Sequence, residues 1–560
     1  MDVRIDRPLD ERQQKLVKQL LDLFEAAKKE RQKVEPVWDD ISDYVLPRLT
    51  EVRHHQTPKP KRYGEKLYTS APISALRLAS NGTSGYMMPR TSVWFRMEPT
   101  DKEVMNLPGV RAFYQDTTDA MHSELNRSNF YGEMTPVLDH GFSIGTSTLF
   151  VEDDEERGVA SLVAVDPMEV YVSENKYKRV DTFFRYTWMT GQRLIERFPD
   201  AIQGPFEDKI KKNPYEMHAV LHCIYKRNDR IHERIDAENK QIASVYILVE
   251  KQHLLRESGF DFPRMVSWRH TRMAGTPYGG SPSWDALVDI MRLNSHSMDL
   301  LDASHLAVRP PMTYPAEMHD IDISPNGLTP YTAPGRVPHR LDVLGDYPVG
   351  RDREEAIEKA IRDHFQTDFF LLLTQSDRQK TAFEVSEMAG ERAAVMSTVI
   401  GRIESELIDP VLEIIYRIAY DAGRMPPVPD VLIENYGGQF KWEYVGPLAQ
   451  LQKRHHGQQA RGAVFAEIVP MFEVFPEARD LVNHDELVKE AMHEGGLSDK
   501  IIRPDQEVAQ LRQMRAQMEM QMREQEMAIE AAKATKGQQP QQEQLMPEEG
   551  ERARATPRDL

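Results

Sequence analysis

Near the middle of the chain, two long helical patterns are separated by only a few polar residues. The first pattern carries apolar residues spaced by four, at Ile357, Ile361, Phe365 and Phe369. The second extends through residues 381–410, where Pro410 is expected to kink or break it. A helix with an apolar stripe must bury that stripe against another element. The chain is therefore constrained to hold two long helices around the short link Thr374-Gln-Ser-Asp-Arg-Gln-Lys380.

The length and charge of the chain exclude some classes of protein. Its 560 residues exceed one ordinary domain, so several domains are expected. The 89 acidic and 71 basic residues give a formal net charge of −18. Tight binding of nucleic acid over a wide surface needs many contacts from Lys and Arg to phosphate. The charge disfavours such a surface, but it does not exclude a protein that lets DNA pass.

Cysteine content and hydropathy indicate the compartment. The single cysteine, Cys223, excludes an intramolecular disulfide and a cysteine-based zinc site. The start of the sequence lacks the apolar core of a signal peptide. No run approaches the roughly 18 apolar residues that a membrane span needs. We expect a soluble protein that matures in a reducing cytoplasm, with no cofactor and no membrane partner.

Periodicity predicts a mixed chain. Helices are expected over 9–33, around Trp38 to Val45, and over 70–87, 109–127, 281–308, 351–373 and 504–536. Strands are expected at 93–97, 146–152, 159–165, 169–172, 182–186, 217–225 and 244–250. Residues 130–270 are thus expected to be mostly β, with the polar turn Asp153 to Gly158 closing a hairpin. The fold class is α+β.

The helix expected from residue 281 has a clear start. Ser281 is a favourable N-cap, and Pro282 suits the first helical position. Trp284, Leu287, Val288 and Met291 are expected to mark its apolar face. Residues 309–350, rich in Pro and Gly, are expected to form an irregular, partly β subdomain. Residues 537–560, rich in Gln, Pro and Glu, are expected to be disordered.

The motifs that carry chemistry elsewhere lack their context here. Gly141-Phe-Ser-Ile-Gly145 matches the nucleophile-elbow pattern around Ser143, but that turn needs a strand before the serine and a helix after it. A strand-like run follows instead, which favours a helix-to-strand turn. No phosphate-binding G-x-x-x-x-G-K-[ST] loop occurs. The acidic run Asp153 to Glu156 lacks calcium-loop spacing and is interpreted as a hairpin tip. No catalytic, cofactor-binding or metal-binding residue is predicted, and the chain is expected not to be an enzyme.

Histidine pairs and basic segments leave alternatives open. His54-His55 and His455-His456 are adjacent, so on a helix or strand each pair diverges rather than chelates. The basic run from Arg53 to Lys66 could contact DNA, although a solvated loop or a contact with a neighbouring subunit is favoured. Arg378 and Lys380 would by default occupy an ordinary surface turn.

The order of several short motifs resembles the head-to-tail connecting, or portal, proteins of short-tailed bacteriophages, over most of residues 10–450. Tyr278-Gly-Gly-Ser-Pro282 is similar to a family element in which a basic residue replaces Gly280. The other motifs are Trp38, Ile41 and Pro47; Tyr68 to Gly82; Met88-Pro89; Trp94-Phe95; Phe142 to Glu152; Asp166 to Tyr171; Pro310-Pro311; Pro334-Gly335; and Thr381-Ala-Phe-Glu-Val385.

The resemblance implies a portal-type subunit with a mixed α/β wing, a two-helix stem, a small clip, a helical crown and a C-terminal barrel helix. Its implied boundaries are a wing at 1–280, stem helices at 281–308 and 351–373, the clip at 309–350, a tunnel loop at 374–381, a long kinked helix returning to the wing at 382–447, the crown at 448–503, the barrel helix at 504–536 and a disordered tail at 537–560.

The resemblance also implies a function. About twelve copies would form a ring at one capsid vertex, the head-tail junction of the virion, through which double-stranded DNA is packaged and later ejected. The implied partners are the terminase motor, tail adaptor proteins, and the major capsid and scaffolding proteins, with assembly in the bacterial host cytoplasm. Gln375, Arg378 and Lys380 would face the DNA. A DNA-packaging enzyme, and another structural protein such as a scaffold, tail-tube or head-tail connector component, are the alternatives.

Overall fold

The computed structural model describes most of the chain up to residue 447 and one long helix near its end. The described residues are 9–47, 67–308, 312–313, 339–340, 347–374, 396–436, 440–447, 505–536 and single positions 449, 483, 485 and 488, with short gaps at 102–103, 106, 108, 155, 229 and 231–235. Two compact units, Met1–Glu467 and Ile468–Leu560, divide the chain and are described separately.

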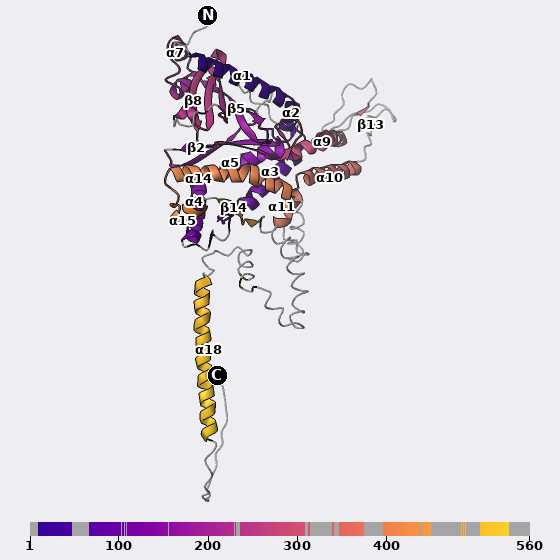
Figure 1. Cartoon of the computed structure of the whole chain (residues 1–560). Coiled ribbons are helices and arrows are strands. Elements are labelled where there is room, and N and C mark those ends of the chain that lie inside the picture. The colour runs from indigo at the N-terminus through magenta and orange to yellow at the C-terminus, as the bar shows by residue number, and fades with distance from the viewer. Residues whose placement is uncertain are drawn as a thin grey trace, which may run out of the picture. The chain divides into compact units, whose positions relative to one another are not determined.

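A five-stranded antiparallel meander forms the first layer of the larger unit. Its spatial order follows the sequence: β4 (Val170–Glu174), β5 (Val180–Thr190), β6 (Met217–Lys226), β7 (Ile242–Leu248) and β8 (His253–Phe260). Helix α1 (Glu11–Gln32) crosses one face of this sheet (Figure 1). Phe24 of α1 meets Tyr171 edge-on at 4.9 Å between ring centroids and stacks on Tyr186 at 5.8 Å. The apolar stripe predicted for this helix therefore packs on the sheet and covers this face.

The opposite face of the five-stranded sheet carries two short helices. Helices α6 (Gly191–Arg197) and α7 (Pro205–Lys212) follow β5 and precede β6. Phe198, Phe206 and Ile210 bury themselves there against Val220 and Leu248. Both helices lie in the region that was predicted to be mostly β. Their apolar patterns span only two turns each, too few to distinguish a helix from a loop by periodicity.

A three-stranded sheet lies next to the meander and belongs to the main core. Its order is β3 (Val159–Val165), β2 (Thr146–Asp154), β9 (Met265–Arg269). Helices α4 (Val110–Arg127) and α5 (Phe130–Ser143) pack beside it. For α5 the sequence predicted only a helix-to-strand turn near Ser143 and no range, although Phe130, Met134 and Val137 stand at helical spacing in its first half and are fully buried.

Apart from the helices within residues 282–308, the other described elements of residues 9–340 are α2 (Glu35–Tyr44), α3 (Ala71–Met87), β1 (Phe95–Pro99), η2 (Ala237–Asn239), η3 (Val249–Lys251), β10 (Thr271–Arg272), β11 (Gly279–Gly280), β12 (Met312–Thr313) and β13 (His339–Arg340).

Two antiparallel helices extend from this core side by side (Figure 1). After the short helix α8 (Pro282–Asp285), α9 (Leu287–Val308) leads outwards and α10 (Tyr347–His364) returns. The Ser281 hydroxyl accepts the Trp284 N–H, as predicted for the N-cap. The single helix predicted over 351–373 is wrong. Gln366 adopts a left-handed φ of 53° and separates α10 from α11 (Thr367–Thr374), although Phe365 and Phe369 are both buried as the pattern required.

The chain then returns to the core through a continuous helical segment. It consists of α13 (Ser397–Ile403), one π-helical turn (Glu404–Ile408) and α14 (Asp409–Asp421). Pro410 lacks an N–H, so the predicted interruption is accommodated by the wider turn before it rather than by a break. Helix α15 (Asp430–Tyr436) and strand β14 (Phe440–Tyr444) follow, and β14 pairs with β1. This pairing joins residues from opposite ends of the unit.

Within its described residues, the second unit contains the long helix α18 (Asp505–Lys536), as predicted. Its methionines stand in solvent; Met518 and Met522 are 62% and 61% exposed. Arg512 makes two ion-pair contacts of 2.5 and 2.6 Å with Asp485. The α+β fold class predicted from the sequence is confirmed. Among the described helices, none is both long and apolar enough to cross a membrane.

Candidate functional site

Helix α11, which leads into the central link, is anchored on the core. Gln375, Arg378 and Lys380 lie outside the described residues, as does the basic segment 53–66 and most of the predicted clip and crown. The link begins directly after α11, where the Phe370 ring lies so close to Gly82 of α3 that a Cβ added there would approach within 2.4 Å. This close approach requires glycine at position 82. The link therefore starts from a fixed point on the core.

The α9–α10 pair is held by polar contacts along its length. His296 Nε2 lies 2.8 Å from the Gly350 carbonyl, and the Ser297 hydroxyl donates to Glu354 at 2.7 Å. Near the core end, His364 Nε2 lies 3.9 Å from Asp289 Oδ2. A Cβ at Gly350 would approach Leu300 within 2.7 Å, so the helices meet closely there. The two helices form a rigid antiparallel hairpin.

Several apolar side chains of α9 are exposed within the described part of the subunit, between exposed polar residues such as Arg292, Asp299 and Asp302. Val288 is 77% and Val308 78% exposed. Three further apolar residues of this helix are exposed by 41–45%: Met298, Leu301 and Leu306. Val288 was predicted to lie on one apolar face with Trp284, Leu287 and Met291; these three are half-buried, whereas Val288 is exposed. The fully buried apolar side chains of α9 are Ile290 and Leu293, on the other side of the helix from Val288.

Ser143 lies in the helix-to-strand turn that the sequence favoured. It is the last residue of α5, and β2 begins at Thr146. Its hydroxyl is fully buried and donates to the Asp139 carbonyl at 2.6 Å. Gly145 has a φ of 92°, and a Cβ there would come within 2.3 Å of the Gly279 carbonyl oxygen. The two glycines of the motif thus allow close packing of the chain. The Ser143 hydroxyl is bonded to a carbonyl of its own helix.

The acidic run is a hairpin tip, also as predicted. Strands β2 and β3 pair up to Asp154 and Val159. The Arg157 N–H donates to Asp154 Oδ1 at 3.1 Å, and Gly158 adopts a φ of 62°. Across the described residues, no group of three or more His, Cys, Asp or Glu side chains has the arrangement of a metal site.

One buried arginine joins three segments that the sequence did not connect. The Arg269 guanidinium contacts Glu174 at the end of β4 and lies 3.4 Å from Glu406 in the π-helical turn. It also donates to the Lys178 carbonyl at 3.0 Å. These contacts tie both sheets to the helix that follows the central link. Sequence spacing gave no signal for them, since the partners are 95 and 137 residues away.

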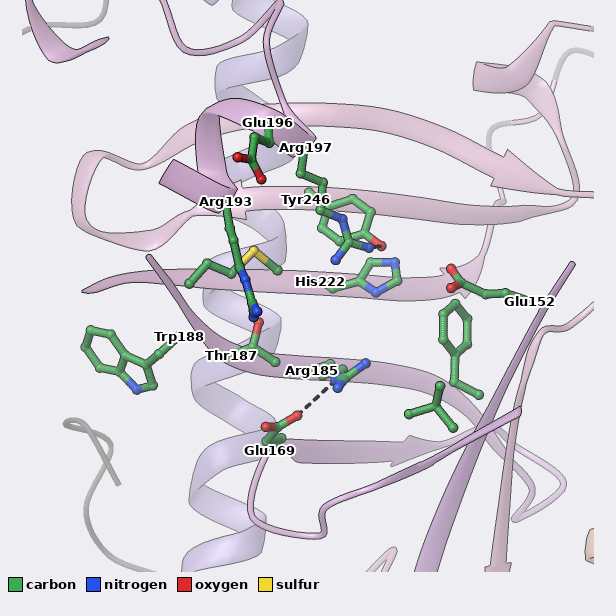
Figure 2. Close-up of a pocket in the computed structure, with 13 residues that line it drawn as sticks. Glu152, Glu169, Arg185, Thr187, Trp188, Arg193, Glu196, Arg197, His222 and Tyr246 are labelled. Atoms are coloured by element: carbon green, nitrogen blue, oxygen red, sulfur yellow. Dashed lines mark hydrogen bonds and ion pairs between the residues drawn. The ribbon is translucent and has the colours of Figure 1, made fainter. Parts of the chain in front are cut away.

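A surface hollow of about 530 Å³ lies where α6 faces the β2–β3 hairpin across the meander (Figure 2). Six charged side chains line it: Glu152, Glu169, Arg185, Arg193, Glu196 and Arg197. Arg185 pairs with Glu169 at 3.0 Å. None of these residues was singled out from the sequence. Arg193 and Arg197 are one helical turn apart, but α6 itself was not predicted.

Two stacked rings form part of the wall of this hollow. His222 and Tyr246 lie 3.9 Å apart between centroids and nearly parallel, with His222 Nε2 2.9 Å from the Ser244 hydroxyl. Burial, and then the nearby Arg197, Arg185 and Arg256, hold the pKa of His222 well below its ordinary value. The ring is therefore neutral, and its stacking fixes the wall.

Comparison with known proteins gives a consistent result. The family model of the bacteriophage head to tail connecting protein matches residues 17–502. A probable portal protein of Bordetella phage BPP-1 is 26% identical over 511 residues, covering 89% of this chain and 91% of the relative. The portal protein of Salmonella phage epsilon15 is 24% identical over 524 residues, covering 90% and 91%. A chain from the virion of a native gene transfer agent particle aligns at 11% identity over 77% of this chain and 90% of its own length, with a TM-score of 0.33.

Proposed function

The chain belongs to the bacteriophage head to tail connecting protein family, and from that premise we propose that it is a phage portal protein. Copies of the chain form a ring at the vertex of the capsid where head and tail join. Double-stranded DNA enters through the ring during packaging and leaves through it during ejection. The family match over residues 17–502 is the observation that carries this proposal.

The α9–α10 hairpin supports assembly into a ring. A rigid two-helix projection with exposed Val288, Leu301 and Val308 leaves apolar surface in water in a lone subunit. Repeating the subunit around an axis would place neighbouring hairpins side by side and bury that surface. Burial of apolar area stabilises association by roughly 25 cal/mol per Å². We assign twelve copies to the ring.

The proposed parts follow the order of the chain. Residues 1–280 form the wing, 281–308 and 351–373 the stem, and 309–350 the clip. Residues 374–381 form the tunnel loop, and 382–447 return to the wing. Residues 448–503 form the crown, 504–536 a helix that bundles with its copies into a barrel, and 537–560 a tail. The exposed apolar residues of α18 support the barrel, because a single helix gains stability when its apolar stripe packs between neighbours.

The charge of the ring suits passage rather than tight binding. Twelve copies at −18 carry −216 in total (12 × 18). DNA carries about one negative charge per 1.7 Å, so the ring as a whole repels it. Gln375, Arg378 and Lys380 line the channel, and rings of the two cations hold the duplex near the axis. Terminase supplies the motor from outside, tail adaptors dock after packaging, and the capsid and scaffolding proteins surround the wing. Assembly takes place in the host cytoplasm before the ring becomes part of the virion.

Mass photometry and negative-stain electron microscopy of the purified full chain test the proposal. The expected particle is a closed ring of twelve 64.6 kDa subunits, about 775 kDa (12 × 64.6), with a central channel. ATP hydrolysis and DNA cleavage are measured on the same sample and are expected at background. Monomers alone at micromolar concentration would contradict the ring, and nucleotide-dependent DNA cleavage would favour a packaging enzyme.

A further inference from the structure

The strand that borders the hollow has an open edge. Strand β5 pairs with β6 along residues 183–190, but its pairing with β4 ends at Arg185 opposite Val170. The last bond on that side is from the Tyr186 N–H to the Glu169 carbonyl, at 2.7 Å. No strand within the described part of the chain covers residues 187–190 on the β4 side. An unpaired edge of this kind is a template for another extended chain.

The backbone polarity of this edge follows from antiparallel geometry. Along a strand, the N–H and C=O groups of alternate residues point to the same side. Because the Tyr186 N–H points towards β4, the N–H and C=O of Trp188 point to the side where β4 has ended. A segment paired beside residues 187–190 would form hydrogen bonds with both the N–H and the C=O of Trp188. Edge addition of this type gives affinity through the backbone and selectivity through the side chains.

Side chains at the same place favour a carboxylate. Arg193 projects from α6 across the hollow towards Thr187 (Figure 2) and, among the described residues, has no ion-pair partner. Arg197 donates to the Tyr246 hydroxyl at 3.1 Å, and the Arg256 guanidinium lies 5.1 Å from the same ring. Glu196 is the only acidic lining residue on α6 among those described, and it accepts from Gln192. Cations are therefore in excess at the α6 end.

The acidic residues of the hollow disfavour binding of a nucleic acid. Figure 2 shows Glu152 on the other side of the hollow from Arg193, and Glu169 already neutralises Arg185. A chain of phosphates along this surface would meet Glu152 and Glu169 after leaving the arginines. A polypeptide with one acidic side chain next to neutral residues fits the alternation of charge.

We propose that the β5 edge and this hollow bind an extended segment of a partner protein, with the segment's backbone paired to Trp188 and an Asp or Glu side chain held by Arg193 and Arg197. The site lies in the wing and is independent of the DNA channel. It would give the wing a specific contact to a protein of the head that presents an acidic strand. His222 and Tyr246, stacked and buried, provide a fixed wall for that contact.

A peptide-binding experiment tests this proposal. The assembled full chain is incubated with a library of fluorescent octapeptides in equal acidic, neutral and basic classes. We expect acidic peptides to be retained at least about tenfold over basic ones, the effect of roughly 1.4 kcal/mol. Arg193→Glu should abolish this preference, since its side chain is exposed and its loss leaves the fold intact. Arg179→Glu, at the exposed turn before the same strand, should retain it.

Hydrogen exchange locates the peptide. With the best retained peptide bound, exchange of the Trp188 amide should slow, because the peptide pairs with it, and the effect should vanish in Arg193→Glu. Retention without charge preference, equal retention by Arg193→Glu, or unchanged exchange at Trp188 would each overturn the proposal. Ring formation is measured on the same samples, so that failure of this site is distinguished from failure of the portal assembly.

Discussion

At the scale of single residues, two glycines with similar backbone have different roles. Gly145 and Gly158 both adopt positive φ, at 92° and 62°. Gly158 closes the exposed β2–β3 turn, and a Cβ there would meet nothing within 4 Å. At Gly145 the backbone of Gly279 passes so closely that no side chain fits. Glycine is therefore needed at position 158 for the turn alone. At position 145 it is needed both for the turn and for the close approach of Gly279.

We predict that Gly145→Ala destabilises the protein more than Gly158→Ala. The strain of positive φ costs roughly 1 kcal/mol at either position. Only Gly145→Ala also forces two backbone segments apart, so its total cost should exceed about 3 kcal/mol. Urea unfolding followed by tryptophan fluorescence measures both variants. Equal midpoints would show that the close approach to Gly279 costs nothing.

A second residue-scale prediction concerns pH. Burial of His222, and then the nearby Arg197, Arg185 and Arg256, hold its folded-state pKa well below its ordinary value of 6.5. Below pH 6.5, His222 binds a proton in the unfolded chain but stays neutral in the folded chain. The free energy of unfolding therefore falls as the pH falls. Titration of His222 lowers the free energy of unfolding by at most about 1.4 kcal/mol for each pH unit. The stability that depends on neutral His222 is fully present above pH 6.5.

Replacing His222 with Gln removes this titration while keeping a polar group beside Ser244. Compared with the parent protein, His222→Gln should lose less unfolding free energy between pH 6.5 and 5. Urea midpoints at several pH values measure the slope. An unchanged slope in the variant would mean that the pKa of His222 does not differ between the folded and unfolded protein.

At the scale of elements, α9 is buried at its start and exposed further along. Ile290 and Leu293 pack into the core, whereas Val288 on the other side of the helix, and Leu301 and Val308 beyond the core, remain exposed. Helix α10 contacts α9 in part through polar contacts from His296 and Ser297. The exposed side chains are therefore free for contact with neighbouring subunits, and substitutions there should leave the subunit's own fold intact.

We predict that Val288→Glu combined with Leu301→Glu prevents ring assembly without unfolding the subunit. Each charge would have to be buried between neighbouring hairpins, which costs several kcal/mol without a partner. Leu23→Glu is the matched control, since Leu23 is 55% exposed on α1. Mass photometry should find small species for the double variant and rings for the control, with unchanged circular dichroism in both. Rings formed by the double variant would exclude the α9 face from the interface.

At the scale of the whole molecule, the proposed ring combines net repulsion of DNA with local attraction. Twelve copies of a chain with net charge −18 would repel DNA, and Arg378 and Lys380 of the proposed tunnel loop would attract it locally. Phosphate contacts of this kind position a duplex without reading its sequence. The link starts from α11, which Phe370 anchors against α3.

We predict that Arg378→Glu combined with Lys380→Glu leaves rings intact but impairs packaging and retention of DNA. The defect should be larger at low salt, because the screening length grows from about 8 Å at 0.15 M to about 30 Å at 0.01 M. Gln375→Glu adds one negative charge to the same link and should have a smaller effect. Nuclease-protected DNA per particle is the readout. Normal packaging by the double variant at every salt concentration would remove these residues from the channel.

The sequence by itself determined the class of elements and the family. Long helices such as α1, α4 and α18 and strands such as β2 and β6 were predicted close to their observed bounds, because a repeated period leaves a clear signal. The glycine turn around Ser143 and the hairpin after Asp153 also followed from local chemistry. The ordered motifs indicated the family that the matched sequence model shows.

Tertiary structure decided what no local pattern records. Whether an apolar side chain of α9 is buried depends on the elements that pack against it, so Val288, predicted on the apolar face, is exposed. The break at Gln366 depends on turning Phe369 and Phe370 onto the core, whereas the helical spacing continues unbroken through it. The Arg269 contacts and the hollow beside α6 join residues far apart in the chain, and the open edge of β5 exists only because β4 is shorter. Strand pairing and side-chain packing depend on which segments meet in the folded chain, and a local sequence pattern does not record this.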